Sequence, residues 1–372
     1  LEAVVVRVAV DVLRVDAVHV GDAPGEQSPD ATLPEVTRKL GWAIVGLGKL
    51  AIEEIIPAFA TAKHSRLVAL VSGHADKARR IADVHGVDPK NIYSYANYDS
   101  LKDNPAVDII YIVLPNSMHA EYTIRGFQAG KHVLCEKPMA PSLEDCQRMI
   151  DAGKQAAKKL MIAYRLHYEP ATQRVTAMCK KRELGLIRSV EATNVQVTRA
   201  PNIRLSSKLG GGPLGDLGIY CINGIRYALG EEPTEVTGSL QLAPDRPDLR
   251  EVPAGYSFTM RFPSGVVAHA DTNFTSARSN HYRIHCERGY LDVDEAYSYD
   301  PPILRVNRDK EGTTQVKTEK VNQFTSEMDH FSRCVLDNKE SDTPGAEGLA
   351  DMRVVKAIEE AARTGATVKV AS

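Results

Sequence analysis

The stretch that decides how the chain begins to fold is WAIVGLGKLA, residues 42–51. Its first half is an apolar run that predicts a buried strand, and its second half is a GxGxxA pattern that opens a segment with helical spacing. Gly46 permits a tight turn, Gly48 has no side chain to block a pyrophosphate, and Ala51 lets the helix pack close to the strand. The free N–H groups at the start of that helix attract phosphate. The stretch therefore predicts a dinucleotide-binding turn rather than a purely structural one.

The chain beyond this turn alternates short apolar runs with helical segments. Apart from the first strand, we expect strands near 66–73, 108–115, 131–138 and 160–165, with helices between them. Right-handed crossovers then give a parallel sheet with helices on both faces. We therefore predict an α/β fold in which residues 41–164 form an N-terminal Rossmann dinucleotide-binding domain.

The pattern changes after Pro170. One helical segment leads to long, partly alternating strands without helices between them, which predicts a large open, mainly antiparallel sheet. Two helical segments, 323–339 and 346–365, follow, and the second carries one apolar stripe of Leu349, Met352, Val355 and Ile358. We assign residues 165–372 to a C-terminal α+β domain for substrate binding and oligomerisation, whose last helix is a candidate to pack back on the first domain.

The composition limits the possible functions. In 372 residues, 46 Lys and Arg stand against 48 Asp and Glu, which excludes nucleic acid as the main partner because phosphate binding needs a concentrated positive field. No apolar run reaches the roughly 20 residues that span a bilayer, so we expect no membrane partner. The six cysteines show no spacing typical of structural zinc or of a disulfide framework. These counts favour a soluble enzyme or small-molecule binder.

Residues 1–40 differ from the rest of the chain. Their valine-rich start is interrupted by charged residues, so it fits neither the apolar part of a signal peptide nor a membrane span, and a Pro/Gly/Asp/Ser linker follows. The first residue is Leu1 rather than Met. We interpret the segment as either an N-terminal arm or an artificial extension and assign it no function.

The end of the second expected strand indicates which dinucleotide binds. Sites for NAD usually carry an acidic residue there, which accepts a hydrogen bond from the ribose 2′-hydroxyl. This chain has Ser72-Gly73-His74 instead, followed by Lys77. A serine hydroxyl, a helix N-terminus and a lysine attract a 2′-phosphate, whereas an aspartate would repel it. The residues therefore favour NADP over NAD, although Ser72 could equally be a turn residue and Lys77 a solvated helix residue.

Three motifs together resemble one enzyme family. AIVGLGKLA (43–51), CEKPMA (135–140) and GGGPLGDLGIYCING (210–224) are similar to the glucose–fructose oxidoreductase and inositol dehydrogenase family. The likeness is greatest to the glucose–fructose, or aldose–aldose, branch, and it runs from about Gly41 to Val368. Many relatives have a histidine where Tyr220 stands, and a tyrosine there is the pattern of that branch.

The resemblance implies a sugar oxidoreductase with tightly bound NADP. In that branch an aldose is oxidised at C1 to its lactone, and a second sugar is then reduced, to an alditol of the sorbitol or xylitol type. The motifs carry catalytic roles to Lys137, Asp216 and Tyr220, and substrate contacts to Lys137, Arg204, Asp216, Tyr220 and Asn223. They carry cofactor contacts to Gly46, Leu47, Gly48, Lys49, Leu50, Ser72, Gly73, Lys77, Tyr95, Leu114, Asn116, His119, Glu136, Lys137, Arg165 and Arg204. The tryptophan that precedes this last arginine in the glucose–fructose enzyme is missing, which affects the choice of substrate more than the chemistry.

The three catalytic candidates suggest a proton-transfer mechanism. A phenol has an ordinary pKa of about 10, so it is a poor base at neutral pH unless a neighbouring cation stabilises the phenolate. We expect Tyr220 to take up and release the proton, Lys137 to tune it, and Asp216 to hydrogen-bond the sugar or Lys137. Without the resemblance, the same residues would be interpreted as a core tyrosine, a surface lysine and a helix cap.

Several alternatives stay open at this point. The protein could be an ordinary NADP-dependent sugar dehydrogenase with an exchangeable cofactor, or a non-catalytic NADP or sugar sensor. We expect no metal site, because His281 and His285 share one strand face but lack a third ligand. The resemblance supports a homodimer or homotetramer, formed through the open sheet, which we expect to expose an apolar face. Localisation is open between cytoplasmic, since no signal peptide is visible, and periplasmic, by analogy with the family.

Overall fold

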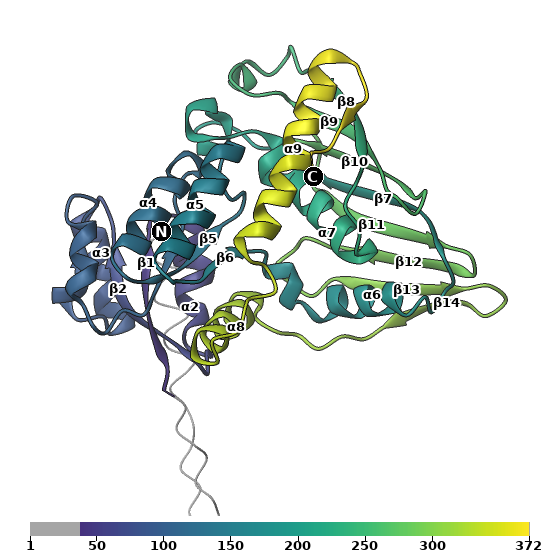
Figure 1. Ribbon diagram of the computed structural model, residues 1–372. Helices are drawn as coiled ribbons and strands as arrows, with labels where there is room; N and C mark the ends of the chain where they lie inside the picture. Colours follow the sequence, from purple (N-terminus) through teal and green to yellow (C-terminus); the bar gives the residue numbers. More distant parts are fainter. Residues whose placement is uncertain (1–37, 372) are drawn as a thin grey trace, which may run out of the picture. The chain divides into compact units, whose positions relative to one another are not determined.

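The computed structural model describes residues 38–371, so nearly all of the proposed N-terminal arm (1–40) lies outside the described residues. Within the described part, six strands form one parallel sheet in the order β3-β2-β1-β4-β5-β6 (Figure 1). Their bounds are β1 Leu40–Val45, β2 Ser65–Val71, β3 Ile92–Tyr93, β4 Ile109–Ile112, β5 His132–Glu136 and β6 Leu160–Ala163. This sheet confirms the predicted Rossmann fold.

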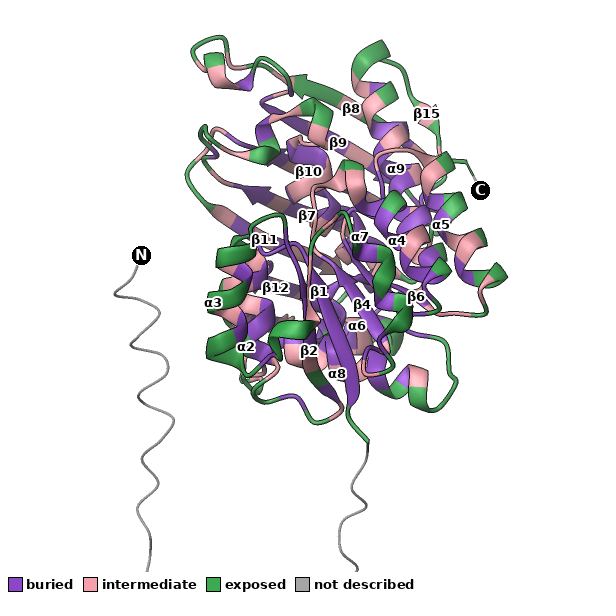
Figure 2. Ribbon diagram, turned by 90° about the vertical axis from the view of Figure 1, so that its left-hand side faces the viewer, coloured by how far each residue is buried: buried purple, intermediate pink, exposed green. Residues whose placement is uncertain are grey.

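Helices cover both faces of this sheet because its strands alternate apolar residues to either side. In β1, Trp42 and Ile44 belong to the cluster under α3 (Ala75–His85) and α8 (Gln323–Leu336), whereas Ala43 and Val45 belong to the cluster under α4 (His119–Gln128) and α5 (Leu143–Gln155). In Figure 2, β1 and β4 are drawn as buried along their length, and the helices around them are buried on their inner sides only. Such strands, apolar on both faces, are typical of a parallel sheet between helical layers.

A second sheet occupies the other half of the described region. Nine strands there have the order β14-β13-β12-β11-β7-β10-β9-β8-β15, and only the β7–β10 pair is parallel. Their bounds are β7 Ile187–Val195, β8 Glu235–Gln241, β9 Gly255–Arg261, β10 Val267–Asn273, β11 Ser279–Cys286, β12 Gly289–Asp294, β13 Ile303–Arg308, β14 Gly312–Val316 and β15 Val368–Lys369. The sheet is therefore mainly antiparallel, as predicted.

The outer face of this sheet corrects one expectation. Its inward-facing side chains, such as Val190, Ala192 and Ile284, are buried, but the side chains between them are polar. On that outer face Asp292 pairs with Arg283 (3.0 Å) and with Arg305 (3.2 Å). The expectation of an exposed apolar face is wrong, because alternation along the strands directs most of the apolar side chains toward the covering helices.

The helical layer of the C-terminal half consists of α6 (Pro170–Lys180), α7 (Ile219–Leu229) and α9 (Gly345–Thr364). The apolar stripe expected on α9 is buried. At Gly348 this helix comes so close to the first sheet that a Cβ there would lie 2.9 Å from Ile162 and 3.0 Å from the sulfur of Met139. The helix α8 packs on the first half too, since Thr325 donates to the carbonyl of Ala58 (2.8 Å).

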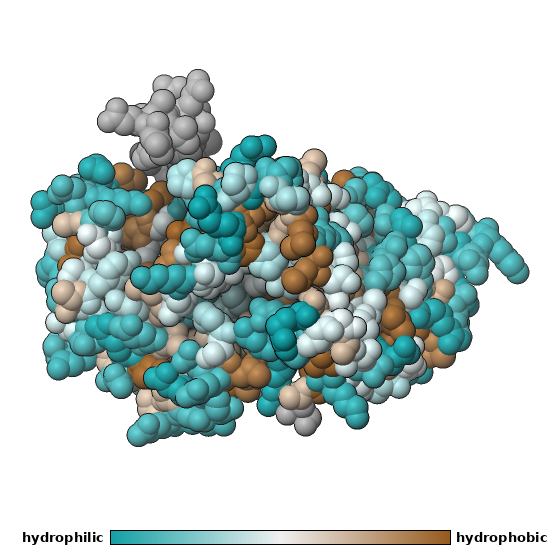
Figure 3. Space-filling model, turned by 90° about the horizontal axis from the view of Figure 1, so that it is seen from above, coloured by the Kyte–Doolittle hydropathy of each residue, from teal (hydrophilic) through white to brown (hydrophobic). Residues whose placement is uncertain are grey.

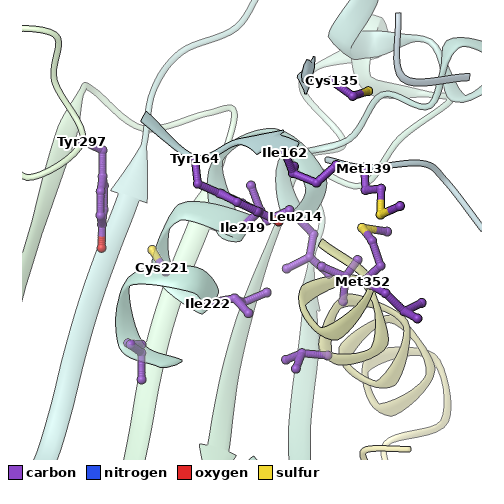
Figure 4. Packing of buried hydrophobic residues seen from close by; sticks show 14 of the residues in the cluster. Cys135, Met139, Ile162, Tyr164, Leu214, Ile219, Cys221, Ile222, Tyr297 and Met352 are labelled. Carbon is purple, nitrogen blue, oxygen red and sulfur yellow. The ribbon is translucent and has the colours of Figure 1, made fainter. Parts of the chain in front are cut away.

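One hydrophobic cluster joins the two halves. Figure 4 shows members that follow or lie on β5 and β6, together with residues before and on α7 and on α9. The sulfur atoms of Met139 and Met352 point toward each other there. Because this cluster is closely packed, the loop after β5 cannot move independently of α7.

The surface is less informative than the core. No helix among the described residues combines the length and the apolarity needed to cross a lipid bilayer. On the face drawn in Figure 3, hydrophobic side chains are scattered among hydrophilic ones.

A buried ion-pair network supports the α7–α9 contact. Arg226 on α7 is 3% exposed and pairs with Asp351, Glu347 and Glu232. Burial raises the pKa of Asp351 to about 6, although the charge of Arg226 opposes this shift.

We expect the substitution Arg226→Leu to lower the free energy of unfolding by about 3–5 kcal/mol, because it leaves buried carboxyl groups without their cation. Urea unfolding followed by circular dichroism measures the loss. The control is Arg363→Leu near the end of α9, where the arginine side chain is 69% exposed and pairs only with Glu360, so the change should stay within about 0.5 kcal/mol. An equal decrease in the free energy of unfolding in both variants would contradict the stabilising role assigned to the Arg226 network.

A half-buried histidine makes stability depend on pH. The Nδ1 atom of His132 accepts a hydrogen bond from the backbone N–H of Lys159 (3.0 Å). Burial, aided by Lys158 and Lys159, lowers the pKa of His132 to about 4. The unfolded chain takes up a proton near pH 6.5, whereas the folded protein does so only near pH 4. Stability is therefore lost as the pH falls through that window.

We expect His132→Asn, whose amide oxygen can still accept the Lys159 N–H, to reduce this acid loss. Between about pH 7 and pH 4.5 the wild-type free energy of unfolding should fall by about 1–2 kcal/mol more than that of the variant. Urea titrations at both pH values measure the difference, with the exposed His269→Asn as control. Identical pH dependence in the wild type and H132N would rule the explanation out.

Candidate active site

A cavity of about 390 Å³ lies where the carboxyl ends of β5 and β6 face the second sheet. Ligands of open α/β sheets bind at this edge. The cavity is lined by polar, charged and aromatic side chains, among them Glu136, Lys137, Arg165, Arg204, Asp216, Tyr220, Arg278, Tyr297, Tyr299, Asp300 and Phe324. Most of the residues predicted to act in catalysis are thus brought together.

The dinucleotide turn reaches this cavity through Leu50, which also lines it. Gly46 has φ +96°, and a Cβ there would lie 2.2 Å from the carbonyl oxygen of Val113, so only glycine fits. A Cβ at Gly48 would meet nothing within 4 Å. The backbone after β1 therefore leaves the open approach that a pyrophosphate needs, and Lys49, which is exposed, follows directly.

The residues expected at the 2′-phosphate gather at the end of β2. The hydroxyl of Ser72 accepts a hydrogen bond from the backbone N–H of His74 (3.1 Å), and Gly73 is exposed. The ammonium of Lys77 donates to the carbonyl of Leu47 in the dinucleotide turn. The ring of Tyr95 lies 3.2 Å from the position of a Cβ on Gly73. This donor set carries a cation and no carboxylate, and it fits a phosphorylated ribose better than a free 2′-hydroxyl.

The next group of predicted cofactor contacts has a mixed outcome. Asn116 donates to the carbonyl of Gly210 (2.8 Å), which ties the loop after β4 to the loop before α7. His119 is fully buried between the carbonyl oxygens of Leu114 and Pro138, each 2.9 Å from one ring nitrogen. His119 therefore connects the loop after β4 with the loop after β5 inside the protein. This differs from the expectation that it touches the cofactor, because the short helical turn before α4 directs its ring into the protein.

The proposed catalytic group is assembled from two halves of the chain. Lys137 follows β5, Asp216 lies in a π-helical turn (Leu214–Gly218) and Tyr220 in the first turn of α7. The ammonium of Lys137 donates to the backbone carbonyl of Asp216 (2.8 Å) and lies 3.8 Å from its carboxylate. It also lies 4.3 Å from the centroid of the Tyr220 ring. The π-helical turn is a common feature of functional sites.

The structure changes the expected role of Lys137 toward Tyr220. Its ammonium faces the ring of the phenol and makes no hydrogen bond with the hydroxyl. Arg165, expected only as a cofactor contact, instead donates from Nη2 to the hydroxyl of Tyr220 (3.4 Å). No other residue between 38 and 371 forms a hydrogen bond with that hydroxyl, which leaves it available to a ligand.

Two further predicted residues complete the charged lining. Arg204 forms an ion pair with the Asp216 carboxylate (2.8 Å), and this carboxylate raises the pKa of Arg204. Burial raises the pKa of Glu136, whose carboxylate accepts a hydrogen bond from Tyr111 (2.7 Å). Asp216 therefore lies between two cations, Lys137 and Arg204, on one wall of the cavity.

The structure does not bring Asn223 to the cavity. This residue is buried one turn further along α7, where its side-chain N–H groups reach Asp351 (2.9 Å) and Glu347 (3.1 Å), and its oxygen contacts His167 (2.8 Å). All of its polar atoms are used inside the protein. The expectation of a substrate contact is corrected accordingly, because the ion-pair network of Arg226 occupies that side of the helix.

Part of the lining was not predicted. Tyr297, Ser298 and Tyr299 follow β12, and Arg278 and Asn280 stand at the start of β11. Tyr297 stacks on Tyr220 with centroids 5.7 Å apart. The only sequence signal is a short run of tyrosine, serine and aspartate after a strand, which by itself is typical of a surface loop.

Across residues 38–371 no group of three or more His, Cys, Asp or Glu side chains is arranged to hold an ion.

Comparisons with known proteins give the family. Residues 40–164 match the model described as "Oxidoreductase family, NAD-binding Rossmann fold", and residues 172–292 match "GFO/IDH/MocA C-terminal domain". The chain is similar to the crystal structure of aldose-aldose oxidoreductase from Caulobacter crescentus complexed with glycerol, with 39% identity and a TM-score of 0.87 over 89% of this chain and 100% of that chain. It is 29% identical to the NADP(+) D-xylose 1-dehydrogenase of Haloarcula marismortui over 88% of this chain and 92% of that protein. It is 25% identical to the 1,5-anhydro-D-fructose reductase of Ensifer adhaerens over 88% of this chain and 98% of that protein. Together with the motifs, these matches establish that the chain belongs to the GFO/IDH/MocA family of oxidoreductases.

Proposed function

We propose that this protein is an NADP-dependent sugar oxidoreductase that oxidises an aldose at C1 to its lactone. The observation that carries the proposal is one cavity in which a lysine ammonium, a carboxylate and a phenol converge beside the dinucleotide turn. The names of the relatives support the substrate class, since two of them act on aldoses and one of these uses NADP. The polar lining with aromatic rings suits a molecule that carries many hydroxyl groups.

The residues of the cavity divide the chemical work. Oxidation at C1 removes a proton from the hydroxyl oxygen and hydrogen with its electron pair from carbon. The cofactor, when bound, accepts that hydrogen and electron pair. Tyr220, which lines the cavity, would hold the proton at its hydroxyl oxygen, whose one hydrogen bond with the described residues comes from Arg165. Lys137 and Arg204 hold Asp216 in place by ion pairing, so that its carboxylate can accept a hydrogen bond from a sugar hydroxyl.

We propose further that the cofactor stays bound between half-reactions and that a second sugar takes the hydrogen back, becoming an alditol. The 39% identity to an aldose–aldose oxidoreductase along that chain's whole length supports this cycle. The main alternative is a dehydrogenase that exchanges its cofactor with solution each turnover, supported by the likeness to an NADP(+) xylose dehydrogenase. A non-catalytic sensor is disfavoured because it has no use for the whole Lys137–Asp216–Tyr220 group.

We expect Tyr220→Phe to lower kcat for aldose oxidation by about 10²- to 10³-fold, because the proton loses its acceptor while the cavity keeps its shape. Cofactor binding, measured by fluorescence titration with NADPH, should stay unchanged. Tyr290→Phe, on the outer face of the second sheet, is the matched control and should keep the wild-type rate. A Y220F variant with near-wild-type turnover would contradict the assignment of Tyr220 as the proton acceptor.

Cofactor retention separates the two catalytic cycles. We expect the purified protein to keep nicotinamide absorbance after extensive gel filtration, and the 340 nm band to rise when an aldose alone is added. Product analysis by mass spectrometry should then find lactone and alditol in equal amounts. Turnover that is strictly proportional to added NADP, with no bound nucleotide after filtration, would instead establish the exchanging dehydrogenase.

A further inference from the structure

Arg165 carries a buried positive charge that forms no ion pair with a carboxylate of the described residues. The side chain follows β6 and the residue is 4% exposed. Its Nη1 donates to the carbonyl of Ser298 (3.0 Å) and to the side-chain oxygen of Gln323, and its Nη2 donates to the carbonyl of Tyr297 (2.8 Å) and to the hydroxyl of Tyr220 (3.4 Å). All four acceptors are neutral. Of the five N–H groups of a guanidinium, only Nε–H is left without a partner among the described residues.

This arrangement is unusual because a buried cation is normally paired with a carboxylate. No carboxylate oxygen of residues 38–371 lies within 4.0 Å of the guanidinium. The rings of Tyr299 and Phe324 flank the group instead, with centroids 4.6 Å and 6.0 Å from Cζ. Aromatic faces hold a cation without cancelling its charge.

The buried carboxyl groups near Arg165 have hydrogen-bond partners of their own. Glu136 accepts hydrogen bonds from Tyr111 (2.7 Å) and from the backbone N–H of Lys137 (3.2 Å). Glu327 on α8 accepts a hydrogen bond from Tyr111 (3.4 Å), and burial raises the pKa of its carboxyl group well above the ordinary value. The other charged groups around Arg165 and Tyr220, on the elements that face them, are Lys137, Arg204, Asp216, Arg278, Glu54 and Asp300. Of these anions, Asp216 pairs with Lys137 and Arg204 rather than with Arg165.

We infer that Arg165 is a positioning residue for Tyr220: its uncompensated guanidinium stabilises the negative charge that the phenol oxygen carries before it takes the proton from the sugar. The inference deepens the proposed function and rests on it. The charge is fixed in place by two backbone carbonyls and by Gln323, so no reorganisation is needed when the phenolate forms. Arg165 thereby stabilises negative charge on the phenol oxygen. Lys137 does not do this directly, because its ammonium faces the ring.

Gln323 is the element that makes this inference testable. It lies at the start of α8, and its side-chain oxygen accepts a hydrogen bond from Nη1 of Arg165, as a carboxylate at this position would. An amide there holds the guanidinium without neutralising it. Gln323→Glu keeps the size and the acceptor oxygen but adds the missing counter-charge, and it changes no group that touches the cavity's proposed substrate.

The experiment measures the pH dependence of kcat for aldose oxidation at saturating NADP in the full-length protein. We expect Q323E to move the half-maximal pH of the acidic limb upward by about 1 pH unit, with the wild-type plateau regained at high pH, because neutralising a nearby cation makes the phenol harder to ionise. Arg165→Gln should move it further and lower the plateau, and Arg165→Lys should restore part of the shift. Gln315→Glu on the exposed strand β14 makes the same change of charge elsewhere and should leave the profile unmoved.

The outcomes distinguish this inference from the proposed function. An unchanged acidic limb in Q323E, with inactive Y220F, overturns the role of Arg165 and leaves the proposed function intact. Active Y220F overturns the proposed function itself. If R165Q does not fold, as judged by circular dichroism, the folded Q323E and R165K variants decide the matter alone.

Discussion

The continuous core between the two sheets is the constraint on which the site depends. Residues after β5 and on β6 pack against α7 and α9 without an intervening solvent layer, and Gly348 lets α9 approach β6 directly. A packed interior resists even small displacements. The ammonium of Lys137 is therefore held at a fixed place against the first turn of α7. The hydrogen bond from Lys137 to the Asp216 carbonyl is the visible result of that packing.

The charged groups of the cavity lie on two walls that differ in how their cations are paired. On one wall Lys137 and Arg204 share the carboxylate of Asp216, which offsets one of their two positive charges. On the other wall Arg165 contacts only neutral oxygens and the phenol. A low-dielectric site strengthens both kinds of interaction.

The sequence patterns located most elements to within a few residues, and the exceptions have physical causes. The strands β13 and β14 are hard to predict from the sequence. In β13 only Leu304 and Val306 are buried apolar residues between polar neighbours, and residues 312–315 of β14 are glycine or polar and exposed. The apolar outer face was a wrong inference from an open sheet, since an open face can be covered with charge ladders. At the site, the motif identified Lys137, Asp216 and Tyr220 as a group, but it did not reveal the contact between Arg165 and Tyr220, and it brought Asn223 into the cavity.

The order of strands and helices, the dinucleotide turn and the family follow from the sequence by itself, because each is recorded in the spacing of residues close together in the chain. Only the tertiary structure decided which side chains meet: Arg165 binds Tyr220, 55 residues later, and Gln323, 158 residues later. Such contacts depend on how two sheets and the helices between them pack, and no local pattern encodes the distance between a guanidinium on one sheet and a phenol on a helix of the other half.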